Sequence, residues 1–154
     1  MAQTQGRQAN LTGNRLERFI ENILLDCGFQ KVKDKKRLLR SQDIDEAGYA
    51  RQVKIGTTIY GTPLKCDFLL VHPEKWSEGL VIEAKWQQVG GTVDEKFPYF
   101  VHNVYASEYD TILVIDGGGY RPGALAWLRY MQRDNFLHIF SMVEFQIWVN
   151  QGNL

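Results

Sequence analysis

Two stretches decide the fold of this chain: Leu64-Lys65-Cys66-Asp67-Phe68-Leu69-Leu70-Val71 and Gly79-Leu80-Val81-Ile82-Glu83-Ala84-Lys85-Trp86. Both are rich in aliphatic residues and have the length of a buried β-strand. Successive side chains of a strand point to opposite faces of its sheet, so Glu83 and Lys85 share one face while Ala84 lies on the other. Asp67 is the carboxylate of the first strand. The pattern predicts two neighbouring strands that bring two acids and one lysine together.

Charged residues inside apolar strands indicate a site, because a buried charge is unfavourable without a partner. Two close carboxylates retain a proton unless a cation lies between them. Oxygen ligands without Cys or His at ligand spacing favour Mg²⁺ or Mn²⁺ over Zn²⁺. Such an ion acidifies a water and stabilises charge at a phosphate, and Lys85 can orient or activate that water. The chemistry suits phosphodiester hydrolysis. The alternative is a solvent-facing sheet surface with a Glu83–Lys85 ion pair.

The composition is that of one ordinary globular domain. The chain has 154 residues, of which 44% are hydrophobic, 12% aromatic and 23% charged, and this length fits a single core. We expect a flexible tail over residues 1–12 and one domain over residues 13–154, with no membrane-spanning segment and no secretory signal. Cys27 and Cys66 lack metal-ligand spacing, so we expect two buried, reduced thiols in a cytoplasmic protein.

The charge is balanced overall but uneven along the chain. The formal net charge is zero, which by itself argues against a nucleic-acid partner. Residues 31–54, however, hold eight Lys and Arg residues against four acids. A local excess of this kind can contact phosphates, although a solvated basic loop explains it equally well.

The remaining segments alternate between helical and strand-like patterns. Residues 14–27 form an amphipathic pattern with Asn14 as the cap and Gly28 as the stop. The other expected helices cover residues 95–107, 121–133 and 142–149, with a short one near 44–50 in an otherwise exposed segment. The expected strands cover residues 29–32, 52–60, 64–71, 80–87, 111–115 and 136–140. Short connections make the middle three an antiparallel meander, and the fold class is α/β with a mixed sheet.

These residues and their order resemble the PD-(D/E)XK nuclease superfamily over residues 14–115. The resemblance implies a restriction-endonuclease-like αβββαβ core, with a mixed central sheet flanked by helices and a C-terminal helix-strand-helix added. It also implies that Asp67 and Glu83 ligate Mg²⁺, that the backbone carbonyl of Ala84 is a further ligand, and that Lys85 assists the water. One departure is Cys66, which stands where many members have proline.

Many members of that superfamily carry a glutamate on the first helix, which matches Glu17. The resemblance therefore implies a catalytic role for Glu17, at the metal site or directly behind its ligands, and the sequence allows two alternatives. Asn14 and Glu17 fit a capping box, in which the acid only satisfies the helix start. Glu21, one turn later, is the alternative inward acid.

Five residues are candidate DNA contacts: Arg51, Lys54, Gln87, Lys96 and Arg121. Gln87 follows the reactive strand, and Lys96 begins the next helix beside Gly90 and Gly91, which permit close approach of a DNA backbone. Arg121 follows three glycines that lack the ending of a P-loop, so we treat them as a turn. An exposed strand end, a helix cap and a turn are the structural alternatives for Gln87, Lys96 and Arg121.

The sequence therefore predicts a Mg²⁺-dependent DNA endonuclease, with Mn²⁺ as a substitute. The resemblance points to a type II restriction endonuclease that cuts double-stranded DNA as a homodimer in the cytoplasm of a prokaryotic cell. One alternative is a structure-selective nuclease, such as a Holliday-junction resolvase or a repair enzyme. Another is a non-catalytic DNA-binding module of the same fold.

Overall fold

A six-stranded mixed sheet forms the centre of the molecule. The computed structural model describes residues 2–154, with side chains described from residue 13 onward. The strands lie in sequence order: β1 (Gln30–Lys31), β2 (Gly48–Thr57), β3 (Pro63–His72), β4 (Trp76–Trp86), β5 (Asp110–Asp116) and β6 (Phe136–Ser141). Strands β2, β3 and β4 form an antiparallel meander, whereas β4, β5 and β6 are parallel to one another, as β1 is to β2.

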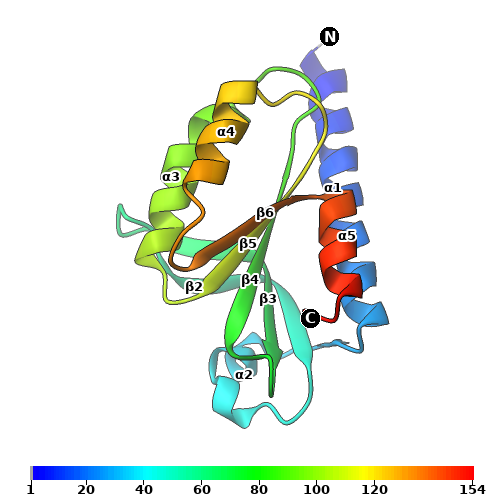
Figure 1. The fold of residues 1–154 in the computed structure, drawn as a ribbon, viewed down its shortest axis with the longest axis vertical. Helices are drawn as coiled ribbons and strands as arrows, with labels where there is room; N and C mark the ends of the chain where they lie inside the picture. Colours follow the sequence, from blue (N-terminus) through cyan, green and yellow to red (C-terminus); the bar gives the residue numbers. More distant parts are fainter. Residues whose placement is uncertain (1) are drawn as a thin grey trace.

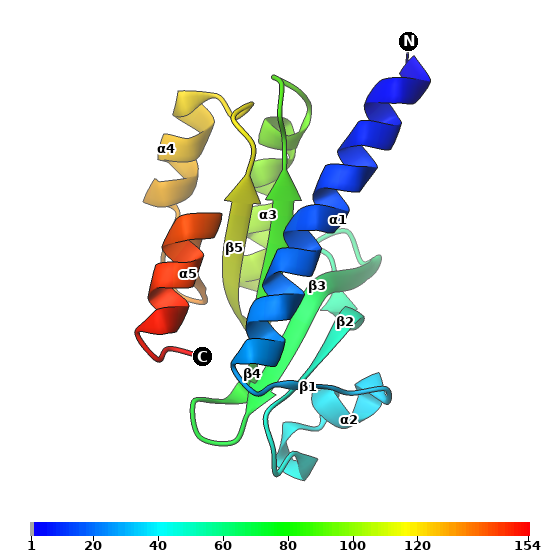
Figure 2. The ribbon, with the colours of Figure 1, turned by 90° about the vertical axis from the view of Figure 1, so that its right-hand side faces the viewer.

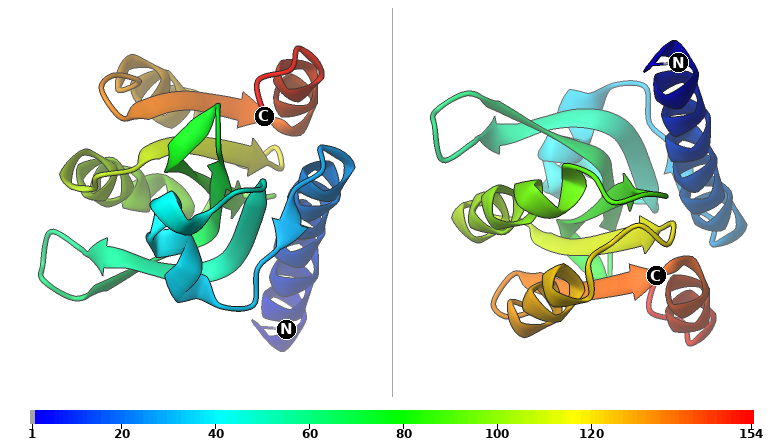
Figure 3. Two further views of the ribbon diagram at one scale, coloured as in Figure 1. Left: turned by 90° about the horizontal axis from the view of Figure 1, so that it is seen from below. Right: turned by 90° about the horizontal axis from the view of Figure 1, so that it is seen from above.

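Helices cover both faces of this sheet (Figure 1). The helices are α1 (Ala2–Asp26), α2 (Lys35–Leu39), α3 (Val93–Ala106), α4 (Pro122–Tyr130) and α5 (Met142–Asn150), with a 3₁₀ turn at Ser41–Asp43. Helices α1 and α5 lie on one face, and α3 and α4 on the other (Figures 1 and 2). Seen from below and from above, the sheet lies between these two helix layers, and the β2–β3 hairpin extends at its side (Figure 3).

Alternation along the strands divides the core between the two faces. Phe68 and Ile82 pack with α1 and α5, and Leu113 packs with α3 and α4. A third cluster on the meander includes Leu38 of α2 and Val81 of β4. Burial of these aliphatic faces fixes the strand register, because a slip of one residue would turn every side chain to the wrong side.

The predicted α/β class and the αβββαβ core with its C-terminal helix-strand-helix are confirmed. The meander of β2, β3 and β4 is antiparallel, as predicted, and β5 and β6 follow it in the predicted order. No helix among the residues described is both long and apolar enough to cross a membrane.

The segment before the meander differs from the prediction. No helix forms over residues 44–50. Instead α2 and a 3₁₀ turn come earlier, and β2 begins at Gly48 rather than at residue 52. Asp34 caps α2 by accepting a hydrogen bond from the Lys36 N–H. An N-cap of this kind can start a helix in a segment that has no apolar periodicity.

Helix α1 also begins earlier than predicted, at Ala2 instead of Asn14. Residues 2–13 lack the apolar stripe of a packed helix, but they contain no proline and several good helix formers. Asn14 therefore lies inside the helix and cannot be its N-cap. The predicted burial of the thiols is correct for Cys66 and wrong for Cys27, which is exposed next to the helix end.

Candidate active site

The predicted acids meet where strands β3 and β4 separate. The antiparallel ladder between these strands has the pairs Leu70–Leu80, Leu69–Val81 and Phe68–Ile82, and Asp67 and Glu83 follow directly beyond the last pair. At that point the carboxylates replace the ladder as hydrogen-bond acceptors. The Asp67 N–H donates to Glu83 Oε1 over 3.3 Å, and the Ala84 N–H donates to Asp67 Oδ2 over 2.9 Å. We call this point, where the β3–β4 ladder ends at Asp67 and Glu83, the fork. There the side chains of the site take the place of direct backbone pairing.

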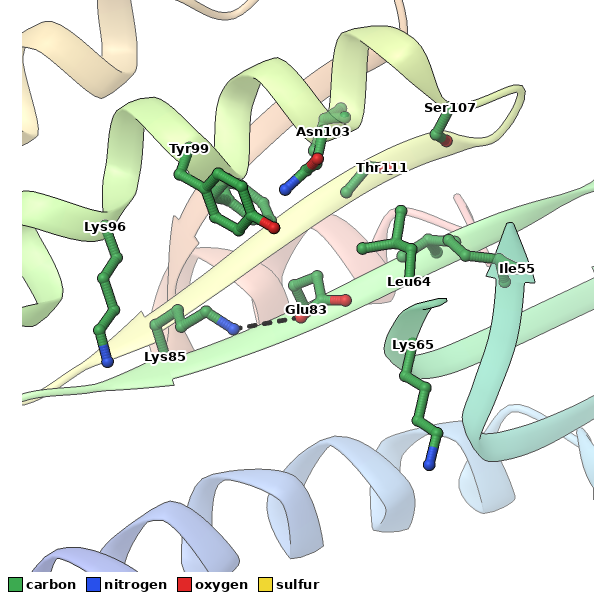
Figure 4. A pocket seen from close by; sticks show the side chains of 13 residues that line it. Ile55, Leu64, Lys65, Glu83, Lys85, Lys96, Tyr99, Asn103, Ser107 and Thr111 are labelled. Carbon is green, nitrogen blue, oxygen red and sulfur yellow. Dashed lines mark hydrogen bonds and ion pairs between the residues drawn. The ribbon is translucent and has the colours of Figure 1, made fainter. Parts of the chain in front are cut away.

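Lys85 completes this group on the face that Glu83 occupies. Its Nζ lies 3.2 Å from Glu83 Oε2 and 5.8 Å from the centre of the Phe100 ring of α3. Figure 4 shows the contact between Lys85 and Glu83. The side chain of Glu83 is only 12% exposed and that of Lys85 34%. Strand β4 positions both groups because it is paired on its other edge with β5 throughout residues 80–86.

Burial and charge set the protonation of these two groups. Burial, together with the nearby charge of Asp67, raises the pKa of Glu83 to about 8, although Lys85 acts in the opposite direction. Burial alone would lower the pKa of Lys85, but the carboxylates of Glu83 and Asp67 outweigh it and the pKa is raised. Lys85 is therefore an ammonium at neutral pH, a group that donates hydrogen bonds rather than one that accepts a proton.

The two acids of α1 are held by a cation from β2. The Arg51 guanidinium forms ion pairs with Glu17 and Glu21 and lies 5.3 Å from the centre of the Phe68 ring. Glu21 also accepts hydrogen bonds from Lys31 Nζ and the Tyr49 hydroxyl, at 2.9 and 2.8 Å. Burial acts to raise the pKa of Glu21, but these hydrogen bonds lower it.

Of the two acids of α1, Glu17 is the one whose charge helps to raise the pKa of Lys85. The capping-box role for Glu17 is wrong, because α1 begins at Ala2. Arg51, which the sequence suggested as a DNA contact, binds these carboxylates in the structure. Its Nε is buried without a hydrogen-bond partner among the residues described.

Two residues of the site escaped the sequence analysis. Gln52 Nε2 donates to Asp67 Oδ1 over 3.1 Å, and the backbone of Gln52 is left-handed, with φ of 52°. The Tyr120 hydroxyl donates to the backbone carbonyl of Lys85 over 2.7 Å. Neither contact has a local sequence signal, since both join residues that are far apart along the chain.

Gln87 is a structural residue instead of a surface contact. It is 4% exposed. Its Nε2 donates to Asp94 Oδ1 and to the Gly119 carbonyl, and its Oε1 accepts from the Val93 N–H. Gln87 therefore ties the end of β4 to the first turn of α3 and to the loop before α4, and its predicted exposure is wrong.

The glycines before α4 serve close packing. A Cβ atom at Gly119 would lie 2.6 Å from Val89 N, and one at Gly117 would clash with the Gln87 carbonyl oxygen. The segment is a turn, as predicted. Arg121, which follows it, is exposed and pairs with the buried Asp94 at 3.8 Å. Lys54 and Lys96 are exposed, so three of the five predicted DNA contacts are accessible to a ligand.

The residues at the fork fit a hard divalent cation that takes few ligands from the protein and the rest from water. Among the residues described, no group of three or more His, Cys, Asp or Glu side chains could cage an ion. Asp67 and Glu83 supply two carboxylates, which suits Mg²⁺ because this ion usually keeps several of its waters. The raised pKa of Glu83 is a second sign of fit, since positive charge at the fork would favour the ionised carboxylate.

Comparison with known proteins agrees with this geometry. The family model described as PD-(D/E)XK nuclease superfamily domain matches residues 8–153. No curated protein and no solved structure matches the chain.

Proposed function

Since the chain belongs to the PD-(D/E)XK nuclease superfamily, we propose that it is a Mg²⁺-dependent DNA endonuclease, with Mn²⁺ as a substitute. The observation that carries the proposal is the meeting of Asp67, Glu83 and Lys85 at the fork of β3 and β4. These charges are partly buried at the ends of apolar strand segments, and a fold has no need of such a cluster for stability.

Each group has a role that follows from its position. Asp67 and Glu83, with the Ala84 carbonyl, would hold the cation, which supplies charge neutralisation at the scissile phosphate and a more acidic water. Lys85 orients the attacking water by donating a hydrogen bond, and its positive charge stabilises the charge that develops on the phosphate. Gln52 holds the Asp67 carboxylate, and Arg51 holds Glu17 close to this group. Hydrolysis leaves a 5′-phosphate and a 3′-hydroxyl.

A plasmid assay tests this activity. Wild-type protein should convert supercoiled plasmid to nicked or linear forms in Mg²⁺ and not in EDTA. Lys85→Ala should lower the rate at least about 100-fold, the size of effect seen when one transition-state donor is removed. Lys75→Ala is a matched control, because Lys75 binds backbone carbonyls near the C-terminus and lies outside the site. Equal rates for Lys85→Ala and wild type would exclude catalysis by this group and favour a non-catalytic DNA-binding module.

More specifically, we propose that the protein is a type II restriction endonuclease that cuts double-stranded DNA as a homodimer. One proposed site among the residues described supports a dimer, because each strand of a duplex needs its own cut and a two-fold axis supplies two equivalent sites. The exposed Lys54, Lys96 and Arg121 are the proposed contacts with the DNA backbone. A structure-selective nuclease is distinguished by substrate: equal or faster cleavage of a four-way junction than of linear duplex would refute the restriction-type assignment.

A further inference from the structure

A pocket opens between α3 and the meander, directly beside the proposed catalytic group (Figure 4). Glu83 and Lys85 form part of its lining, and Phe100 and Tyr99 of α3 form the opposite wall. Its volume is about 210 Å³. This is several times the roughly 30 Å³ of one water in the liquid, yet below the ~300 Å³ at which pockets for drug-sized ligands begin. The space suits one small group.

The lining combines apolar walls with one oriented donor. Ile55 and Leu64 of the β2–β3 hairpin face the aromatic side chains of α3 across the pocket (Figure 4). Asn103 is 5% exposed, and its Oδ1 accepts the Ile59 N–H over 2.8 Å. This contact fixes the orientation of the amide, so Nδ2 is turned toward the pocket, where the Tyr99 hydroxyl is within reach of one of its two hydrogens (Figure 4). A ligand here would be an apolar ring that carries a hydrogen-bond acceptor.

The charges around the pocket are mostly positive. Lys65, Lys85 and Lys96 line it, against the single carboxylate of Glu83. In Figure 4, Lys96 and Lys65 flank the Glu83–Lys85 pair on its two sides. Lys54 is the register partner of Lys65 on the neighbouring strand and adds to the same side of the hairpin. The ring that enters the pocket is therefore attached to a polyanion.

We propose that this pocket binds one unstacked nucleobase, from the nucleotide next to the scissile phosphate. The inference rests on the proposed nuclease function and adds a feature of the bound DNA: one base of the duplex is turned out of the helical stack. Phe100 and Tyr99 replace the stacking that the base loses, Asn103 donates to a base carbonyl, and the lysines contact the adjacent phosphates. Unpaired bases leave the stack at least cost, so they are preferred.

A binding experiment distinguishes recognition of the base from recognition of the bend that an extra nucleotide causes in the duplex. Affinities are measured by fluorescence anisotropy in EDTA for two duplexes of one sequence. One carries a single extra thymidine, and the other carries an extra abasic nucleotide at the same place. Wild-type protein should bind the thymidine duplex about tenfold more tightly, an effect within the range of one base stacked on an aromatic side chain.

Two variants assign this preference to the pocket. Leu64→Trp fills the pocket from the hairpin side, and Phe100→Leu keeps an apolar wall but removes the ring. Each should reduce the ratio of the two affinities to about one. Val143→Trp is the control, because Val143 is 69% exposed on α5, on the opposite face of the sheet. It should keep the wild-type ratio.

Equal affinities of the wild type for the two duplexes, or an unchanged ratio in Leu64→Trp, would overturn the pocket assignment. The ratio is measured within one variant, so a partly unfolded preparation does not mimic its loss. No cleavage occurs in EDTA, so failure of wild-type protein to cut plasmid in Mg²⁺ would refute the nuclease proposal alone.

Discussion

Gln52 combines a left-handed backbone with a side chain that binds Asp67. A residue with a Cβ in this conformation is strained by about 1–2 kcal/mol. Such strain at a functional site indicates that the surrounding structure imposes it. We therefore expect substitutions at this position to change the free energy of unfolding and the cleavage rate independently.

The first prediction compares Gln52→Gly with Gln52→Ala. Both variants lose the amide that holds Asp67, so cleavage should fall in both. Gln52→Gly relieves the backbone strain, and its free energy of unfolding should exceed that of Gln52→Ala by about 1 kcal/mol. Urea denaturation and the plasmid assay measure the two effects. A glycine variant that is less stable than the alanine variant would contradict the assignment of strain.

Glu83 gives a pH dependence with a definite sign. Without a divalent cation, the folded protein keeps the Glu83 proton up to a pKa of about 8, whereas the ordinary value is 4.5. Between these values the unfolded state binds fewer protons, so this group lowers the free energy of unfolding as pH rises. Below 4.5 the group is protonated in both states and contributes no such penalty.

The measurement for Glu83 compares wild type with Glu83→Gln in EDTA. The variant keeps a similar volume and does not titrate. Its stability relative to wild type should therefore increase from pH 4.5 to about 8 and stay constant above that. A difference that does not change with pH would show that Glu83 ionises normally. Saturating Mg²⁺ should stabilise the wild type more than the variant at the upper pH, because only the wild type offers the second carboxylate.

The loops at the ends of β4 and β5 form one packed unit. The Gly119 N–H donates to the Gln87 carbonyl over 3.0 Å, and a Cβ atom at Gly119 would clash with the backbone of Gln88 and Val89. The pairing positions the start of α4 and the Tyr120 hydroxyl behind Lys85. Small residues are required where the two loops touch.

Adjacent glycines provide a matched test of that packing. Gly119→Ala would place a Cβ atom 2.6 Å from backbone atoms, whereas Gly118→Ala would meet nothing within 4 Å. Gly119→Ala should destabilise the protein by about 1–3 kcal/mol, the usual result of forcing atoms into a packed site. Gly118→Ala should leave the urea midpoint unchanged. Equal midpoints for the two variants would contradict the close approach of the loops.

The elements that the sequence predicted well are those with strong patterning of burial. Strands β3, β4 and β5 read as apolar runs because both of their faces are covered, and α1 is recognisable from the stripe that packs on Phe68 and Ile82. The start of β2 is not, because Gly48 and Tyr49 follow a polar segment with no alternation. The first turns of α1 lack a stripe and give no periodic signal.

The three central residues of the candidate site were predictable from the sequence, but the contacts of the residues around them were not. Asp67, Glu83 and Lys85 could be grouped because strand alternation and one short connection bring them together. The exposure of Gln87 could not be predicted, since it depends on Asp94 and Gly119. Likewise Arg51 reads as a surface cation until the fold places two glutamates of α1 beside it. Long-range contacts of this kind have no signature in a local window.

A prediction for the whole molecule concerns its assembly on DNA. One chain carries one proposed site, whereas a double-strand break requires two cuts. A homodimer should convert plasmid to the linear form without accumulation of nicked circles, and sedimentation with DNA should give the mass of two chains. A monomer would produce nicked circles first and sediment with one chain. The second result would refute the dimer and leave the nuclease chemistry intact.

The way the β3–β4 ladder ends has a consequence for hydrogen–deuterium exchange. The amide hydrogens of Asp67 and Ala84 are hydrogen-bonded to the carboxylates of Glu83 and Asp67, respectively. An ion that draws the carboxylates to itself would weaken those two bonds while it stabilises the fold as a whole. Loading with Mg²⁺ should therefore slow exchange across the sheet and accelerate it at these two amides, which gives a spectroscopic mark of metal uptake that requires no substrate.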